Sequence, residues 1–212
     1  MRSPLADAQR EALIAAMLPD VAFDGWSRAA LRAAARREGM PAGEALALFA
    51  GGAADLVAAF SRRTDRLMLD RLEAAPIDAL RPSERIGLAV GIRFDILTPW
   101  REAVRRSLSL LALPQNAPLA LRLTYRTVDA MWYAAGDTAT DFSFYSKRLS
   151  LAAIYAAAVL YWLDDRSEDF AETRAFVERR LQGAARVARI RRDLETVTRR
   201  LPDPFRLLRP QR

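Results

Sequence analysis

Strong helix-forming residues run through this chain from end to end, and no segment shows the alternating pattern typical of a β-strand. Ala, Leu, Arg and Glu dominate its 212 residues, and these residue types favour a helix. Pro and Gly interrupt the pattern at intervals and so mark where helices begin and end. The sequence therefore predicts an all-α protein with helices over 5–18, 27–39, 41–49, 54–74, 83–97, 100–113, 119–135, 142–163, 168–183 and 184–201.

The first sixty residues predict a helix-turn-helix arrangement. Ser27 is a good N-cap for one helix, Gly39 is a good left-handed C-cap for it, and Pro41 fits the first turn of a short helix that follows. Such an arrangement makes a compact three-helix module. The predicted domain organisation is a helix-turn-helix-like module over 1–52, a larger helical domain over 53–183, and a basic amphipathic helix with a tail over 184–212.

A DNA-binding module would read base edges with its second helix, which is here the segment PAGEALALF at 41–49. This segment contains no Arg, Lys, Asn or Gln, and residues 1–60 hold six Arg against seven acidic residues. DNA binding needs hydrogen-bond donors and an excess of positive charge. We therefore interpret the module as structural and expect no DNA binding.

The composition excludes most catalytic and metal-binding chemistry. The chain has no Cys and no His, which removes thiolate nucleophiles, the commonest general base and the commonest transition-metal ligand. Acidic residues cluster within 164–172, but a carboxylate di-iron bundle also needs His, so we interpret the cluster as a helix boundary. We expect no enzyme activity, no catalytic residue, no metal ion and no cofactor.

The positive charge is concentrated at the C-terminal end. The net charge is +7, yet residues 179–212 alone carry eleven Arg and three acidic residues. Apolar residues recur among these Arg residues at helical spacing, as in helices that lie in an anionic membrane interface. A helix docked on the core and a coiled-coil seam are the alternatives. The predicted membrane-binding residues are Val187, Ile190, Arg191, Leu194, Val197 and Leu201.

Aromatic residues gather in the segment 128–163. At helical spacing such residues form a protein core, whereas outward-facing ones form hot spots for protein binding. Phe144, Tyr145 and Lys147 directly follow a polar turn, and both interpretations stay open for the two rings. Small Ala residues between 152 and 158 leave room for close helix packing or for a lipid tail.

Several segments resemble a known family. AGDTATDFSFYSKRLSLAAIY at 135–155 and SEDFAETRAFVERRL at 167–181 are similar to the signature of the ninth coenzyme Q biosynthesis protein family. GWSRAALRAAARREGM and ALFAGGAADLVAAF also resemble that family and, more distantly, the helix-turn-helix of TetR regulators. The resemblance covers most of residues 10–182, with Phe144 where the family commonly has Trp and Ala139 where Ser is usual.

The resemblance implies a TetR-like fold and a lipid-binding accessory protein of ubiquinone biosynthesis. It implies a homodimer with a hydrophobic cavity for an isoprenoid quinone or phospholipid, and a C-terminal amphipathic helix that contacts a membrane surface. It also implies binding to the di-iron demethoxyubiquinone hydroxylase. The resemblance places the partner-binding surface at Gly136, Asp137, Asp141, Phe144 and Tyr145.

The placement of aliphatic and aromatic residues suggests which side chains line a lipid channel. These residues are Phe94, Leu97, Trp100, Leu123, Met131, Ile154 and Tyr155. The chain has no uncharged apolar run of about 18 residues and no apolar signal segment at its start, so we expect a cytoplasmic protein, peripheral on the inner membrane of a bacterium. The alternative function is a TetR-type transcriptional regulator that binds DNA and a hydrophobic effector.

Overall fold

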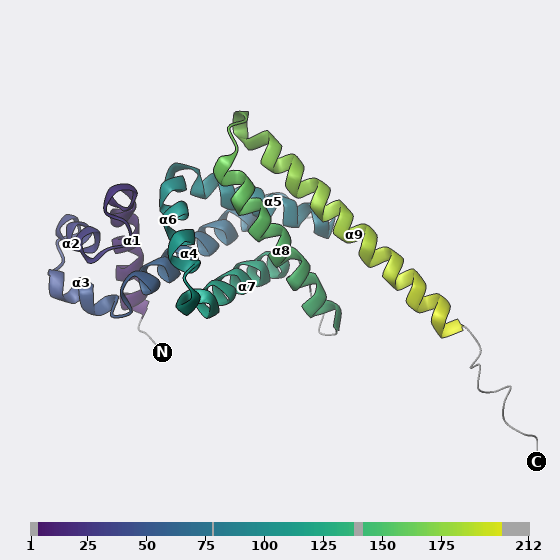
Figure 1. Ribbon diagram of the computed structural model, residues 1–212, viewed down its shortest axis with the longest axis horizontal. Coiled ribbons are helices and arrows are strands. Elements are labelled where there is room, and N and C mark those ends of the chain that lie inside the picture. Colours follow the sequence, from purple (N-terminus) through teal and green to yellow (C-terminus); the bar gives the residue numbers. More distant parts are fainter. Residues whose placement is uncertain (1–3, 78, 138–141, 201–212) are drawn as a thin grey trace, which may run out of the picture.

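The structure, a computed structural model, describes residues 4–77, 79–137 and 142–200, and its elements are helices joined by short turns (Figure 1). The first three helices are α1 (Pro4–Asp24), α2 (Arg28–Arg37) and α3 (Ala42–Leu48). The helices that follow are α4 (Gly52–Glu73), α5 (Pro82–Leu97), α6 (Arg101–Leu111), α7 (Ala117–Ala134), α8 (Phe142–Asp164) and α9 (Ala171–Arg200). The prediction of an all-α protein is confirmed.

Polar and glycine signals set the helix ends of the N-terminal module. The Ser27 hydroxyl accepts a hydrogen bond from the Ala30 N–H at 3.2 Å and caps α2. Gly39 has a φ of +65°, the left-handed conformation that ends a helix with little strain only at glycine. α3 begins directly after Pro41. α1, α2 and α3 therefore form the predicted helix-turn-helix arrangement.

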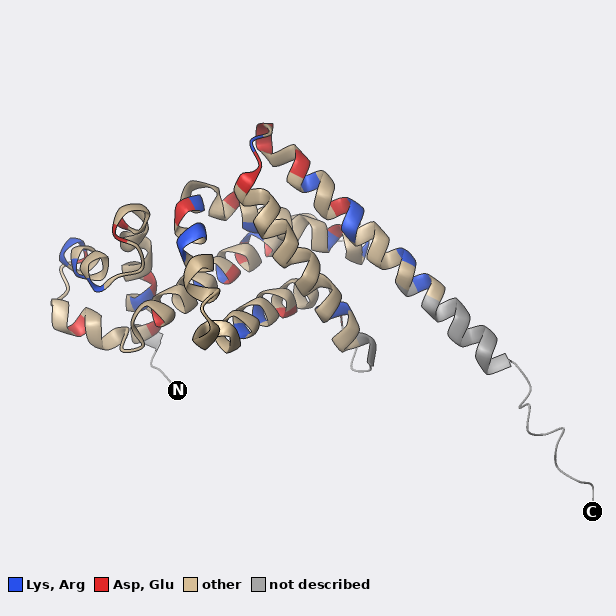
Figure 2. Cartoon of the chain, viewed as in Figure 1, with Lys and Arg blue, Asp and Glu red and all other residues tan. Residues whose placement is uncertain are grey.

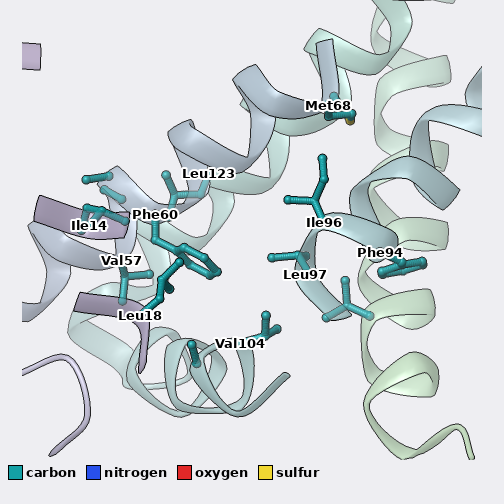
Figure 3. Close-up of a cluster of buried hydrophobic side chains, with 14 of the residues drawn as sticks. Ile14, Leu18, Val57, Phe60, Met68, Phe94, Ile96, Leu97, Val104 and Leu123 are labelled. Atoms are coloured by element: carbon teal, nitrogen blue, oxygen red, sulfur yellow. The ribbon is translucent and has the colours of Figure 1, made fainter. Parts of the chain in front are cut away.

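A continuous cluster of buried side chains joins this module to the other helices. Figure 3 shows Ile14 of α1 beside Val57 and Phe60 of α4. The Trp26 ring lies 5.1 Å from the Phe60 ring, and its Nε1 donates to the Ala103 carbonyl at 3.2 Å. Burial stabilises such contacts by about 25 cal/mol per Å² of apolar surface, so the module is packed firmly on the body of the protein.

α9 is one continuous helix, and the prediction of a separate helix over 184–201 is wrong. The break was expected at Gly183, which instead lies inside α9. Glycine costs about 1 kcal/mol relative to Ala inside a helix, but it ends the helix only where the backbone turns left-handed, as at Gly39. The first part of α9 packs on α5 and α8, and its last part extends away from the body (Figure 1).

The C-terminal part of α9 is strongly basic. Acidic and basic residues alternate up to Glu178, and from Arg179 to Ile190 every charged residue is an Arg (Figure 2). None of the described helices is both long and apolar enough to cross a membrane by itself. One pair, α3 with α4, meets the length and composition requirement jointly, with a bend of 75° between the two helices.

Candidate functional site

A groove with a volume of ≈ 880 Å³ lies between α9, the N-terminal end of α5, the C-terminal end of α7 and the first half of α8. We call it the α9 groove. Its walls are mainly apolar, and its volume falls within the range of small-molecule sites in proteins. The larger apolar residues on its walls are Ile86, Trp132, Leu151, Ile154, Leu181 and Val187.

Polar atoms are few in the α9 groove. The indole Nε1 of Trp132 is buried and has no hydrogen-bond acceptor among the described residues. Lys147 Nζ lies 5.5 Å from the centre of a Trp132 ring, and Arg81 and Arg189 also line the groove. Apolar walls, an unused indole donor and basic side chains together suit an amphipathic molecule whose polar end carries oxygen.

A second apolar space, which we call the inner pocket, lies between α4, α5, α6, α7 and α8 and has a volume of ≈ 380 Å³. Its apolar wall residues include Phe60, Leu97, Val104, Leu123 and Val159. Leu160 of α8 also lines the pocket and is 61% exposed. The inner pocket therefore opens to solvent beside α8.

A buried polar network drawn from four helices borders the inner pocket, and three of its residues line the pocket wall. Arg93 donates from Nε to the Tyr155 hydroxyl at 2.7 Å and from Nη1 to Asp65 Oδ1 at 2.5 Å. The Thr127 hydroxyl donates to the same Asp65 oxygen at 2.8 Å. Burial by itself lowers the pKa of Arg93, but its interactions with Tyr155 and Asp65 outweigh burial and raise the pKa. Arg93 therefore stays charged inside the protein.

The residues predicted to line a lipid channel are divided between these two spaces and the core. Four of them lie on walls, Leu97, Leu123 and Tyr155 in the inner pocket and Ile154 in the α9 groove. The other three pack in or against the core, and these are Phe94, Trp100 and Met131. Contact of the four wall residues with a lipid stays a prediction.

The predicted partner-binding residues lie at the start of α8 and at the turn before it. Tyr145 is 66% exposed, and its ring packs edge-on against the Phe144 ring at 5.1 Å. The Arg148 guanidinium lies 3.4 Å from the centre of the Phe144 ring, which holds that ring against the helix. Tyr145 is thus the ring that projects into solvent, while Asp141 lies outside the described residues.

Asp137 and Gly136 shape the end of α7 rather than a flat binding surface. Asp137 accepts a hydrogen bond from Lys147 Nζ at 2.7 Å and another from Arg148 Nη1 at 3.2 Å. The Asp137 side chain is 8% exposed, so it holds the first turns of α8 in place. Gly136 has a φ of +83°, which other residues rarely adopt. Asp137 therefore holds the start of α8, which carries Tyr145, through Lys147 and Arg148.

The predicted membrane-binding residues lie in the part of α9 that leaves the body and beyond it. Val187 and Ile190 are 67% and 53% exposed. Four further residues have side chains outside the described part of the chain, namely Arg191, Leu194 and Val197 of α9 and Leu201 after it. Earlier in α9, Val177 is buried and Leu181 is half-buried against the other helices. The apolar stripe of α9 is thus covered in its first half and uncovered at Val187 and Ile190.

The corner between α8 and α9 is held by Asp165. Its carboxylate accepts four hydrogen bonds, from the N–H and hydroxyl of Ser167 and from the N–H and hydroxyl of Thr173, at 2.5 to 2.9 Å. Burial by itself raises the pKa of Asp165, but these hydrogen bonds outweigh it and lower the pKa to about 2. Asp165 therefore fixes the direction in which α9 leaves α8.

Acid is expected to weaken this corner. Because the folded-state pKa of Asp165 is below its ordinary value of 3.8, ionised Asp165 stabilises the fold by about 2 kcal/mol above about pH 5, and this contribution is lost as the pH falls from about 4 to 2. Urea unfolding at pH 5 and at pH 2 measures the difference. In Asp165→Asn the free energy of unfolding should fall by less between pH 5 and pH 2. An equal fall in the variant and the unchanged protein would contradict the role given to the Asp165 carboxylate.

The surface of α3 offers few groups that could bind DNA. Its exposed residues are Ala42, Gly43, Glu44 and Ala47, and Glu44 accepts a hydrogen bond from Gln9 at 3.2 Å. These residues supply no side-chain donor for base edges or phosphates. Within the described ranges, no group of three or more Asp or Glu side chains is placed to hold a metal ion.

Two parts of the site were not anticipated from the sequence. Trp132 falls among the aromatic residues of the segment 128–163, and the sequence motifs include neither Asp65 nor Arg93. Arg93 did carry a signal, because it stands between Ile92 and Phe94 in a helix whose other residues are mostly apolar. An Arg in such a position is buried only when a partner compensates its charge.

Comparison with known proteins links this chain to one family. A family profile described as COQ9 matches residues 117–188. The chain is 32% identical over 179 residues to human "Ubiquinone biosynthesis protein COQ9, mitochondrial", covering 81% of this chain and 56% of that protein. It is 30% identical over 196 residues to the Drosophila melanogaster protein, with coverages of 91% and 60%, and 33% identical over 182 residues to COQ9-B of Xenopus laevis, with coverages of 82% and 62%. The chain thus spans less than two thirds of the length of these relatives.

The fold is similar to that of a solved TetR transcriptional regulator from Nitrosomonas europaea. The two structures share a TM-score of 0.68 at 25% sequence identity, and the match covers 84% of this chain and 98% of that one. The predicted TetR-like fold is confirmed. The segment matched by the family profile contains α7, α8 and the first part of α9, which together form most of the α9 groove and carry Tyr145.

Proposed function

The chain belongs to the COQ9 family, and we propose that it is an accessory protein of ubiquinone biosynthesis and not an enzyme. In this proposal it takes up an isoprenoid quinone precursor at a membrane surface and presents it to the di-iron demethoxyubiquinone hydroxylase. The observation that carries the proposal is the position of the α9 groove. It lies between the uncovered apolar stripe of α9 and the start of α8, which carries Tyr145.

The apolar walls of the groove suit an isoprenoid tail. A tail drawn from a bilayer into water costs about 25 cal/mol per Å² of exposed apolar surface, so a carrier must cover the tail as it leaves the membrane. Ile154, Leu181 and Val187 form an apolar surface along the groove. Val187 belongs both to the groove wall and to the uncovered stripe of α9, so the groove is continuous with the proposed membrane contact.

The polar end of a quinone precursor carries oxygen atoms, and Trp132 supplies a donor for one of them. A buried indole N–H without an acceptor costs free energy until a partner arrives. Trp132 Nε1 is such a donor among the described residues, and its side chain lines the groove. A head group bound there would lie beside Lys147 at the start of α8, near the proposed partner surface.

Tyr145 supports the proposed contact with the hydroxylase. An exposed Tyr held by a rigid helix is the kind of residue that dominates binding energy in protein interfaces. Its ring packs edge-on against Phe144, and Phe144 packs against the Arg148 guanidinium. Because the turn at Gly136 and Asp137 lines the α9 groove, a hydroxylase docked on Tyr145 would face one end of the bound quinone.

The proposed homodimer uses the outer face of α8. Leu149 and Leu160 are 74% and 61% exposed, and Ala153 and Ala156 lie exposed between them on the same helix face. An apolar stripe of this length on a helix suits a second copy of the chain. We further propose that the protein is peripheral on the cytoplasmic face of a bacterial inner membrane, with the basic end of α9 facing anionic lipid.

The alternative function is that of a DNA-binding regulator, and the TetR-like fold favours it. The surface of α3 opposes it, because Glu44 is the exposed charged residue on that helix and no described side chain there donates to base edges. A fold of this kind hosts different functions according to its sites. The sites described here therefore favour lipid handling.

One experiment with two variants tests the proposal. Ala184→Trp places a large side chain in the α9 groove, and we expect the purified protein to lose most of its bound quinone or lipid, measured by mass spectrometry. Tyr145→Asp should keep the lipid and weaken capture of the hydroxylase about thirtyfold or more, as for the loss of an interface hot spot. Lipid content should therefore fall in Ala184→Trp and not in Tyr145→Asp.

Matched controls lie on the same helices or face solvent in the same way. Gln182→Trp is the control for Ala184→Trp, because it adds the same side chain to α9 outside the groove. Tyr125→Asp is the control for Tyr145→Asp, because it makes the same change at an exposed Tyr on a different helix, α7. Equal lipid content in Ala184→Trp and Gln182→Trp would remove the groove from the proposal. Equal hydroxylase capture by Tyr145→Asp and Tyr125→Asp would remove the partner surface.

A further inference from the structure

An arginine-lined cleft lies where α1, α4 and α7 meet, and among the described residues it shares no lining residue with the α9 groove or the inner pocket. We call it the arginine cleft. Its volume is ≈ 550 Å³, and its basic residues are Arg10 of α1, Arg62, Arg63 and Arg66 of α4, and Arg126 of α7. Figure 2 shows the basic residues along α4 and α7, which pack against each other.

The acidic residues of the cleft are mostly engaged by particular arginines. Three of the four acids on its wall have such partners, Glu11 with Arg66, Asp129 with Arg148 and Asp65 with Arg93. Arg10 is satisfied by Asp55, at 2.6 Å. The fourth acid, Asp7, is exposed. These pairings leave positive charge on the α4 and α7 walls that the acids of the cleft do not neutralise.

Arg126 carries most of that positive charge, and Arg63 adds to it because it shares the single carboxylate of Glu11 with Arg66. Arg63 Nε is buried and has no hydrogen-bond acceptor among the described residues, and Glu11 Oε1 lies 3.9 Å away, beyond hydrogen-bond distance. Burial lowers the pKa of Arg63, as is usual for a cationic group that is partly removed from water. Arg126 faces the same cleft from α7, is exposed, and forms no ion pair within the described part of the chain.

We propose that the arginine cleft binds a phosphate group, carried either by a free phosphate ion or by a lipid head group. Guanidinium groups present several N–H donors in a plane and match phosphate oxygens better than an ammonium does. A phosphate between α4 and α7 accepts from Arg63 Nε and from Arg126. Tyr133, which is 80% exposed, lines the cleft and adds a hydroxyl donor.

Titration calorimetry of the whole chain at low salt tests this site. The probes are inorganic phosphate and, separately, a short-chain phosphatidic acid kept below its micelle concentration. Arg126→Gln should lower the affinity about tenfold or more, since a charged donor to phosphate is lost. Arg63→Lys keeps the charge but removes the Nε–H fork, and we expect a comparable loss.

Arg122→Gln is the matched control, because it removes the same charge from the same helix one turn away and outside the cleft. Binding of inorganic phosphate that falls in Arg126→Gln and not in Arg122→Gln supports a site for the free ion. The same pattern with phosphatidic acid alone supports a lipid head group. Absence of binding by either probe, or equal loss in Arg122→Gln and Arg126→Gln, overturns the proposal.

Discussion

Replacing Arg93 by Met is expected to lower the free energy of unfolding by about 3–5 kcal/mol, because the change leaves the charge of Asp65 buried without a cationic partner. Arg93 and Asp65 are 4% exposed each, and they join at 2.5 Å. Tyr155 also loses the donor that its hydroxyl now accepts from. Urea unfolding monitored by circular dichroism measures the change.

The double variant Arg93→Met/Asp65→Leu separates the buried charge from the loss of packing. It removes both charges, and replacement of a buried pair by apolar residues is often close to neutral. We therefore expect the double variant to be more stable than Arg93→Met alone. The effects of the two substitutions on the free energy of unfolding would then not add, as is usual for residues in direct contact. A loss below about 1 kcal/mol in Arg93→Met would contradict the assigned role of the network.

The same network connects stability to the inner pocket. Asp65, Arg93, Thr127 and Tyr155 come from α4, α5, α7 and α8, and three of them line the inner pocket. Helices that surround a pocket cannot pack against each other across it, so they lose contacts there. The hydrogen bonds of the network hold the four helices at one edge of that space and compensate part of this loss.

Most of the fold could be predicted because its signals are local. Ser27 and Gly39 act on residues within one turn, so the ends of α2 follow from the sequence alone. Gly183 shows the limit of such reasoning. Whether a glycine ends a helix depends on whether the chain must turn there, and α9 instead continues across α5 and α8.

The candidate site was harder to predict because it depends on residues far apart in the sequence. The apolar spacing of α5 and α7 marks Leu97, Leu123 and Met131 equally as inward-facing, yet two of them line a pocket and Met131 is fully buried in the core. The difference depends on how five helices meet, which helical periodicity does not encode. Asp65 and Arg93 likewise pair across 28 positions.

A chain that ends at Gly183 should lose most of its binding to anionic membranes. The residues after Gly183 include nine Arg and three acidic residues, and a basic residue near an anionic surface contributes about 1 kcal/mol. Even if only two or three Arg engage, affinity for vesicles containing phosphatidylglycerol should fall about a hundredfold. Flotation of the intact and shortened chains with such vesicles measures this.

The shortened chain keeps the packing that attaches α9 to the body. Asp165 still accepts its hydrogen bonds from Ser167 and Thr173, and Val177 remains buried. A loss of flotation therefore reports on the protruding part of the helix and not on unfolding. Because α9 is continuous, removal of that part also takes Ala184, Ala185, Val187 and Arg189 from one wall of the α9 groove. A second variant is needed to distinguish loss of membrane contact from loss of the groove wall.

Ile190→Asp makes this distinction, because Ile190 is exposed and does not line the α9 groove. It keeps every Arg and places a charge in the apolar stripe, so a helix that lies in the interface should bind vesicles much more weakly. Leu121→Asp changes an apolar side chain of α7 that is 74% exposed and should leave binding unchanged. If Ile190→Asp floats as well as the intact chain while the shortened chain does not, charge alone attracts α9 to the membrane, and the stripe must serve a protein partner instead.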